Sequence, residues 1–485
     1  MKTIIIGAGI AGIATAIRLA VKGDQVTVFE ANEYPGGKLT AFRQEGYRFD
    51  AGPSLFTMPN LVEELFVLAQ KNPKDYFQYE KLDTICRYFY EDGTYIEGFA
   101  DAQKFAKEIA EKTDVAKDKV LKHLKKSAEL YALTSSVFLE KSLHKSSTFF
   151  NGTTFKAALQ LHKLNALESM ANYNKRFFKN EKITQLFNRF ATYNGSNPYQ
   201  APATLNVIPH LEHNVGAFFP KGGMHAITQS LVQLAKDIGV KFVFNKRVKE
   251  IIVKEKKAQA IRLKGKKIIE ADRVISNMDI FHTYKKMLPN EKHPTKILEQ
   301  EKSSSGLVFY WGMKLETPHL GLHNIFFSNN YEEEFKTIFN KKEAYIDSTI
   351  YLNISSKHQK KDAPKGCENW FVMINVPNNT GQNWDEIIVE SRQNIIKKLS
   401  RMLGKNIADF IECEQILDPR LIEKKTSSHL GALYGNSSNN RMAAFFRHAN
   451  FSSQIKNLYF CGGSVHPGGG IPLCLLSAKI IGEMI

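Results

Sequence analysis

The first thirty residues constrain the fold more than any other part of the chain. Lys2–Ile6 is a short apolar run with three isoleucines, which predicts a buried parallel strand. A glycine turn follows at Gly7–Gly12, and an apolar helix is predicted over Ile13–Val21. A second strand is predicted over Gln25–Phe29, and it ends at the acid Glu30. This order of strand, turn, helix and strand predicts a parallel α/β sheet at the start of the chain.

The spacing of the glycines predicts that this turn binds a dinucleotide. Gly7 allows the tight turn, Gly9 lets a pyrophosphate approach the backbone, and Gly12 lets the helix pack against the strand. Free N–H groups and the helix dipole hold the phosphates, and Glu30 can accept hydrogen bonds from a ribose diol. The alternative is a glycine-rich turn in an ordinary α/β sheet. The predicted contacts in the turn are Gly7, Ala8, Gly9, Ile10, Ala11 and Gly12.

Length and hydropathy indicate a large soluble protein. A chain of 485 residues can bury a sizeable core and is expected to hold two or more subdomains. No apolar run approaches the roughly 20 residues that span a bilayer. Because a core strand is predicted to begin at Lys2, we expect no cleavable signal and a cytoplasmic location.

The five cysteines are scattered and form no CxxC pair. This pattern predicts reduced thiols, and it argues against a zinc site or a disulfide framework, so no metal is expected.

The formal net charge of +17 indicates an anionic partner. The candidates are nucleic acid, an anionic membrane surface and an acidic ligand, and a solvated surface without a partner is the alternative. The chain has no zinc-finger or ribonucleoprotein motif, so no nucleic acid is expected.

A second glycine-rich segment follows the acid-terminated strand. Pro35–Lys38 contains paired glycines, which let the backbone pass close to a bulky flat ligand. A hairpin is predicted from Thr40–Gln44 and Tyr47–Asp50, and Gly52–Ser54 comes directly after it. An NAD-dependent dehydrogenase has no need of a glycine pair at this point.

With this second segment, the chain resembles the FAD-binding start of the amine oxidase and phytoene desaturase superfamily. That family usually has Arg after the glycine pair, whereas this chain has Lys38, which keeps the charge but loses the planar fork. In the resembled fold, the backbone of a strand near Val248 pairs with the adenine. The resemblance therefore implies FAD, with further contacts at Glu30, Ala31, Gly36, Gly37, Lys38, Gly52, Pro53, Ser54 and Val248.

The C-terminal end carries a second, more specific signature. A strand is predicted over Asn457–Phe460, followed by a glycine-rich loop and a helix over Leu473–Met484. A helix start aimed at the flavin ring stabilises the negative charge of its reduced form. The string His466–Pro472 resembles the C-terminal motif of carotenoid desaturases of the bacterial phytoene desaturase type. A flavin amine oxidase with another substrate is the alternative. The implied contacts are Gly462, Gly463, Gly470, Ile471 and Pro472.

The resemblance implies an α/β (α+β) fold with an FAD-binding Rossmann-like domain of the amine oxidase type. This domain is predicted to be discontinuous, over residues 1–60, 205–278 and 428–485. Residues 61–204 are predicted to form a helical subdomain that faces substrate and membrane, and residues 279–427 a mixed-sheet substrate domain.

The predicted mixed sheet is rich in aromatic residues. Its clearest strands are Gly306–Gly312, Ser348–Asn353 and Trp370–Asn375. Their aromatic side chains either line an apolar tunnel or form ordinary core, and the sequence does not separate the two.

Basic and apolar residues alternate through Lys141–Asn180. A basic amphipathic surface on an anionic membrane is one interpretation, and a helical subdomain with a solvated lysine face is the other. The residues concerned are Lys141, Leu143, Lys145, Phe149, Phe150, Phe155, Lys156, Leu159, Leu161, Lys163, Leu164, Lys175, Arg176, Phe177 and Phe178.

One dinucleotide fingerprint, rather than two, predicts that the substrate itself reduces the flavin. A hydride is expected to pass to flavin N5 while a proton leaves the neighbouring carbon, and the electrons then go to a quinone or to oxygen. For an allylic carbon, little acid–base help is required, because the developing cation is delocalised. His466 is either a proton acceptor or a structural hydrogen-bonding group, and Arg189 and Glu129 are further catalytic candidates.

Within the family, the chain resembles the 1-hydroxycarotenoid 3,4-desaturases, mainly at Phe187–Phe190 and Tyr193–Tyr199. This implies a hydrophobic carotenoid substrate that gains one double bond near a hydroxylated end group. A phytoene desaturase that forms several double bonds is the alternative inside the class. A lipid or partner carrier like the Rab escort proteins, without redox activity, is the alternative outside it.

Overall fold

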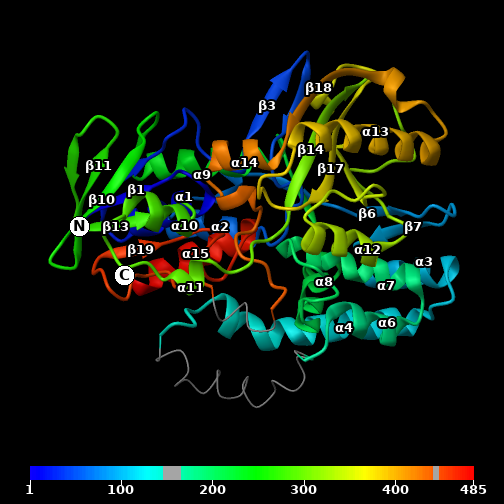
Figure 1. Cartoon of the computed structure of the whole chain (residues 1–485), viewed down its shortest axis with the longest axis horizontal. Helices are drawn as coiled ribbons and strands as arrows, with labels where there is room; N and C mark the ends of the chain where they lie inside the picture. The colour runs from blue at the N-terminus through cyan, green and yellow to red at the C-terminus, as the bar shows by residue number, and fades with distance from the viewer. Residues whose placement is uncertain (146–164, 166, 441–446) are drawn as a thin grey trace.

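A computed structural model describes residues 1–145, 165, 167–440 and 447–485 (Figure 1). A parallel five-stranded sheet lies beside both termini. From one edge to the other its strands are β19 (Leu458–Phe460), β13 (Arg273–Ser276), β1 (Lys2–Ile6), β2 (Gln25–Phe29) and β9 (Lys241–Val243). All four strand pairs are parallel, so segments from both ends of the chain share one sheet.

The two faces of this sheet are covered by different elements because β1 alternates its side chains. Ile5 packs against the helix layer, whereas Ile4 and Ile6 pack on the other side, where the small antiparallel sheet contributes Val248 and Ile251. The helices are α1 (Ile10–Val21), α2 (Asn60–Leu68), α9 (His225–Asp237) and α15 (Ile471–Met484), and the small sheet is β10 (Val248–Lys254), β11 (Lys257–Leu263) and β12 (Ile268–Glu270).

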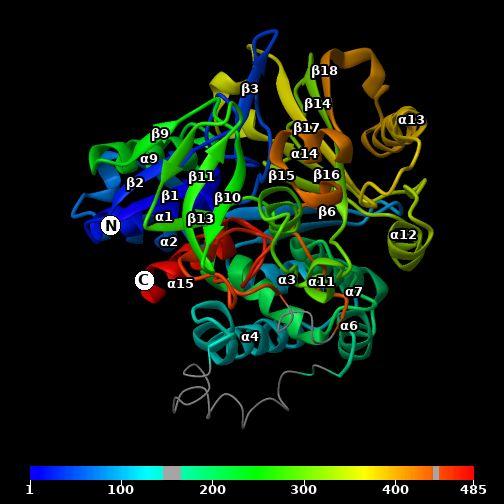
Figure 2. The same ribbon diagram turned by 60° about the vertical axis from the view of Figure 1, so that its left-hand side comes forward.

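A seven-stranded mixed sheet stands at the other side of the molecule (Figures 1 and 2). Its strand pairs are antiparallel except for β15 with β6. Helix α13 (Trp384–Leu403) packs on one face. In spatial order the strands are β18 (Ile411–Leu417), β14 (Ser305–Met313), β17 (Glu368–Val376), β16 (Ile350–Ile354), β15 (His323–Phe326), β6 (Thr84–Phe89) and β7 (Tyr95–Phe99).

The prediction of a helical segment over residues 61–204 is wrong for its early part. Strands β6 and β7 form a hairpin that joins the seven-stranded sheet. Burial in β7 alternates along Tyr95–Phe99, and Gly93 takes a positive φ of 83° in the turn. A period of two around a glycine turn indicates strands, but the helical pattern of the neighbouring segments led to a helical prediction for this part as well.

Helices do make up most of the remaining part of that segment. They lie below the seven-stranded sheet in Figure 1, and their core includes Phe105, Ile183 and Phe187. They are α3 (Ala102–Lys112), α4 (Lys117–Thr134), α6 (Met170–Phe178) and α7 (Glu181–Asn188), followed by the short α8 (Ile208–His210).

The predicted basic amphipathic surface is described only in part. Leu143 and Phe178 are buried and Lys145 and Lys175 are exposed, which at these four positions matches the alternative of a helical subdomain with a solvated lysine face. Among the described residues, no helix is both long and apolar enough to span a bilayer. Phe149, Phe150, Phe155, Lys156, Leu159, Leu161, Lys163 and Leu164 lie outside the described residues.

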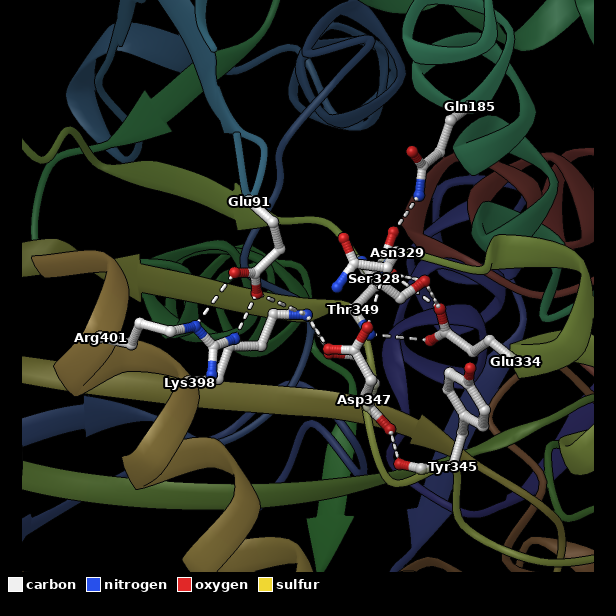
Figure 3. Close-up of polar contacts among 11 residues, drawn as sticks. Glu91, Gln185, Ser328, Asn329, Glu334, Tyr345, Asp347, Thr349, Lys398 and Arg401 are labelled. Atoms are coloured by element: carbon white, nitrogen blue, oxygen red, sulfur yellow. Dashed lines mark hydrogen bonds and ion pairs between the residues drawn. The ribbon is translucent and has the colours of Figure 1, made fainter. Parts of the chain in front are cut away.

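A buried polar cluster joins the helical part to the seven-stranded sheet (Figure 3). The Glu334 carboxylate accepts hydrogen bonds from the Ser328 hydroxyl at 2.8 Å and from the backbone and hydroxyl of Thr349 at 3.0 and 2.7 Å. Gln185 of α7 donates to the Ser328 carbonyl at 2.8 Å. Because Thr349 directly precedes β16, the cluster fixes the start of a central strand against α7 and α12 (Tyr331–Lys336).

Candidate cofactor and substrate site

A cavity of about 740 Å³ lies between the parallel sheet and the seven-stranded sheet. It collects residues from both ends of the chain, which are far apart in sequence. The predicted cofactor residues that line it are Gly9, Ile10, Ala11, Gly36, Gly37, Lys38, Gly52, Pro53, Ser54, Gly462, Gly463, Gly470, Ile471 and Pro472.

Two helices begin at this cavity. Gly9 is the N-cap of α1, and Gly470, with a positive φ of 104°, is the N-cap of α15. The N–H groups and dipole of a helix start attract negative charge, so both helices favour an anionic or electron-rich ligand. A Cβ at Gly52 would lie 1.7 Å from the Lys38 carbonyl, and one at Gly9 would lie 2.6 Å from Asn277 Oδ1. At Gly9 and Gly52 there is therefore no room for a side chain. Together with the two helix starts, these loops fit a dinucleotide such as FAD.

Asn277 connects the two glycine loops, and sequence reasoning missed it. Its Oδ1 accepts a hydrogen bond from Gly12 N–H at 3.1 Å, and its Nδ2 donates to the Cys461 carbonyl at 3.1 Å. It also lines the cavity. The available signal was its place directly after the apolar run that forms β13 and ends at Ser276, since ligands bind at the carboxyl ends of parallel strands.

Glu30 holds the N-terminal turn against the strand that follows. Its Oε2 accepts a hydrogen bond from Ala8 N–H and its Oε1 from Asn32 N–H, both at 2.8 Å. Each carboxylate oxygen has a further lone pair available for a ribose hydroxyl.

The predicted cofactor residues that do not line the cavity are Gly7, Ala8, Gly12, Glu30, Ala31 and Val248.

Lys38 joins the second glycine-rich segment, Pro35–Lys38, to the chain at Ala432 and Leu433. Its Nζ donates hydrogen bonds to the carbonyls of Ala432 and Leu433, at 3.1 and 2.7 Å. Burial lowers the pKa of Lys38 to about 8, although the nearby Asp279 carboxylate acts in the opposite direction. The lysine thus supplies a positive charge to the cavity and uses two of its three donors to close it.

One face of the seven-stranded sheet forms the wall opposite the glycine loops. On β14, the alternate residues Val308 and Tyr310 line the cavity, whereas Phe309 and Trp311 pack into the core beneath α13. On β17, Phe371 and Met373 line it in the same way. The aromatic residues that the sequence left undecided therefore divide between cavity and core according to the strand's period of two.

A buried ion pair lies at the end of the cavity nearest the helical part. Arg189 Nη2 is 2.8 Å from Glu212 Oε2 and 2.6 Å from the Tyr88 hydroxyl. The Tyr193 hydroxyl contacts the other oxygen of Glu212. Burial is the largest single effect and lowers the pKa of Arg189, but Glu212, Tyr88 and Cys86 together outweigh it, so the pKa is raised. Arg189 is therefore a fixed cation, and Glu212, which sequence reasoning missed, is its counter-ion.

The other two catalytic candidates do not line the cavity. His466 is buried, and its Nε2 is 2.9 Å from the Lys141 carbonyl. Burial lowers the pKa of His466 to about 4, so the ring is neutral at physiological pH. This geometry matches the structural alternative for His466. Glu129 is exposed on α4, so its placement near the chemistry is wrong.

Comparison with known proteins gives the family. The sequence model of the family described as flavin containing amine oxidoreductase matches residues 10–481. A 1-hydroxycarotenoid 3,4-desaturase from Flavobacterium sp. (strain P99-3) is 52% identical over 484 residues, which cover 100% of this chain and 99% of that protein. A phytoene desaturase from Fusarium fujikuroi is 29% identical over 515 residues, with 100% of this chain and 89% of that protein covered.

Solved structures show the same fold at low sequence identity. An oxidoreductase from Methanosarcina mazei superimposes with a TM-score of 0.67 at 16% identity, and the match covers 100% of both chains. The predicted fold class, family and cofactor are confirmed. The chain belongs to the flavin-containing amine oxidoreductase family, in which it groups with the carotenoid desaturases, and it is an FAD-dependent oxidoreductase.

Proposed function

We propose that this protein introduces a C3–C4 double bond into an acyclic 1-hydroxycarotenoid, as a step of carotenoid biosynthesis. The observation that carries the proposal is the 52% identity, over the whole chain, to a desaturase of that specificity. A phytoene desaturase is the weaker alternative, since its relative is 29% identical.

In the proposed arrangement, both ends of the chain hold the cofactor. Gly9, Ile10 and Ala11 bind the diphosphate, Glu30 the ribose, and the strand at Val248 the adenine. Gly470, Ile471 and Pro472 place the start of α15 at the flavin ring. Residues 1–60, 205–278 and 428–485 thus form the FAD-binding domain, residues 61–204 the helical subdomain, apart from the β6–β7 hairpin, and residues 279–427 most of the substrate sheet.

FAD, when bound, supplies an acceptor for a hydride at N5. The protein's part is to place one C–H bond of the substrate against that acceptor in a site without water. Val308, Phe371 and Met373 on the sheet face suit this, because their apolar side chains would pack against a polyene without offering hydrogen bonds. The second hydrogen leaves the neighbouring carbon as a proton.

The chemistry of the proposed substrate favours work at a membrane surface. A carotenoid dissolves in the bilayer, so we propose that the protein binds an anionic membrane peripherally and hands its electrons to a quinone or to oxygen. The net charge of +17 and the exposed Lys145 and Lys175 support this attraction.

Two pigment-producing hosts test the proposal. Expression in cells that make 1-hydroxylated acyclic carotenoids should give a product with two fewer hydrogen atoms and absorption at longer wavelengths. Expression in cells that make only phytoene should leave the pigment unchanged. Lycopene in the second host would contradict the proposal and favour the phytoene desaturase alternative.

The absorption spectrum of the purified protein distinguishes an enzyme from a carrier. We expect a flavin absorption spectrum that is bleached when a 1-hydroxylated carotenoid is added without oxygen. A protein that binds the carotenoid but never bleaches would instead be a carrier.

A further inference from the structure

The sheet face that lines the cavity is mainly apolar on one side and polar on the other. Strands β14 and β17 present apolar and aromatic residues, as described above. Strands β16 and β15 present Tyr351 and His323, and the adjoining helical part adds Arg189 and Glu212. These four residues are called the polar wall below. Because neighbouring strands are about 4.8 Å apart, the polar wall lies only one or two strands away from the apolar face.

The polar wall is buried, and its own contacts do not use all of its hydrogen-bonding capacity. Arg189 is 6% exposed and Glu212 is 1% exposed. The Nε of Arg189 and the Nε2 of His323 have no hydrogen-bond partner within the described parts of the chain. The Tyr351 hydroxyl is 2.7 Å from both His323 Nδ1 and Ser54 Oγ.

Such a wall is unfavourable beside a pure hydrocarbon. A ligand without polar atoms would cover the part of the ion pair that still faces the cavity without offering it any hydrogen bond. A hydroxyl group, which donates one hydrogen bond and accepts up to two, can satisfy a carboxylate and an N–H donor together. The wall therefore fits an otherwise apolar ligand that carries a single hydroxyl.

We propose that the polar wall of Arg189, Glu212, His323 and Tyr351 binds the C1 hydroxyl of the carotenoid end group and so selects the hydroxylated substrate. This inference rests on the proposed function and names the residues that would give it specificity. The polyene then runs along Val308, Phe371 and Met373, away from the wall.

The position of the wall agrees with the bond that is to be oxidised. The hydroxyl-bearing carbon and C4 are three C–C bonds apart, each about 1.5 Å long, so the hydroxyl must bind within a few ångströms of the reacting carbons. Ser54, the partner of Tyr351, belongs to the Gly52–Ser54 segment that is proposed to contact FAD. A hydroxyl at Tyr351 would thus keep the C3–C4 bond beside the cofactor.

The test compares substrates that differ only at C1, with the full-length, FAD-loaded enzyme. They are a 1-hydroxylated acyclic carotenoid, its 1-methyl ether and the analogue that lacks the oxygen. The preference is the ratio of kcat/KM values, and we expect the wild type to favour the hydroxylated compound by at least 100-fold. A site built to bind a hydroxyl rejects analogues without one by up to about 10⁴-fold.

Variants then assign this preference to the wall. Glu212→Gln and Tyr351→Phe should each lower the preference at least tenfold, mainly by lowering kcat/KM for the hydroxylated substrate. Tyr310→Phe is the matched control, because it removes a hydroxyl that also lines the cavity but lies on β14, outside the wall. This control should keep the wild-type preference, whatever its effect on the overall rate.

Binding of the product provides a readout that does not depend on turnover. The shift of the polyene absorption band gives dissociation constants for the desaturated product and for its 1-methyl ether. We expect the wild type, but not Tyr351→Phe, to bind the hydroxylated product at least tenfold more tightly.

The outcomes separate the two proposals. A wild type that does not desaturate the hydroxylated carotenoid would refute the proposed function, while the binding preference would still decide the role of the wall. Variants that keep the wild-type preference in rate and in binding would overturn the inference. If Glu212→Gln does not fold, Tyr351→Phe carries the test alone.

Discussion

His123 on α4 is an imidazole enclosed by aromatic rings. It is 1% exposed, and its ring centroid is 4.5 Å from that of Phe187 and 4.9 Å from that of Phe178. Neither ring nitrogen has a hydrogen-bond partner among the residues described. Burial, followed by the positive charge of Lys126, lowers the pKa of His123 from 6.5 to about 3. Between about pH 3 and pH 6.5, the folded protein therefore holds this ring neutral while the unfolded chain protonates it.

The linkage between protonation and folding gives the magnitude. Below pH 6.5 the unfolded chain binds a proton that the folded protein does not, so stability falls as the pH drops, until it levels off near pH 3. Between pH 7 and pH 5, these two pKa values correspond to a loss of about 2 kcal/mol from this single residue. His123→Phe removes that loss and places a third apolar ring beside Phe178 and Phe187.

Urea unfolding of the FAD-saturated protein at pH 7 and pH 5 measures the effect. The wild type should lose about 2 kcal/mol more of its free energy of unfolding between pH 7 and pH 5 than His123→Phe does. Tyr173→Phe is the control, since it alters a ring beside His123 without removing an imidazole, and it should behave like the wild type. The reasoning fails if wild type and His123→Phe lose the same stability between the two pH values.

Three further substitutions test the site and its support. Asn277→Leu removes two hydrogen bonds of about 1 kcal/mol each. The affinity for FAD, measured by fluorescence titration of the apoprotein, should therefore fall about 30-fold. An unchanged affinity would contradict the role of Asn277 as a bridge between the two loops. Gly52→Ala places a Cβ 1.7 Å from a backbone oxygen and should yield colourless protein, whereas Gly321→Ala, with ordinary contacts, should purify yellow. Glu334→Ala removes the acceptor of three hydrogen bonds, from the Ser328 hydroxyl and from the backbone and hydroxyl of Thr349. It should lower stability by about 2–4 kcal/mol in urea unfolding, but Glu334→Gln should lower it less.

Sequence reasoning located the cofactor loops because their chemistry lies in short contiguous strings. The turn at Gly7–Gly12 and the loop at His466–Pro472 each carry their own spacing, and the positive φ angles of Gly7 (98°) and Gly470 (104°) favour glycine. Turn geometry of this kind is local, so it can be predicted before the fold is known.

The remaining parts of the site depend on tertiary packing. Asn277, Glu212 and Tyr351 come from separate elements, and nothing around each of them in sequence shows which group it will meet. The β6–β7 hairpin was missed for a similar reason, since its partner strand β15 lies more than 200 residues further along the chain. Arg189 was identified as important, but its role depended on finding its counter-ion.

The order of strands in the parallel sheet has a consequence for folding. Strand β13 pairs with β19, and α15 packs on α1, so one layer is completed by segments that lie far apart in the chain. The two glycine loops that line the cavity come together only when these distant segments meet. A variant that lacks α15 would therefore lose one wall of the cavity, and we expect it to bind FAD poorly.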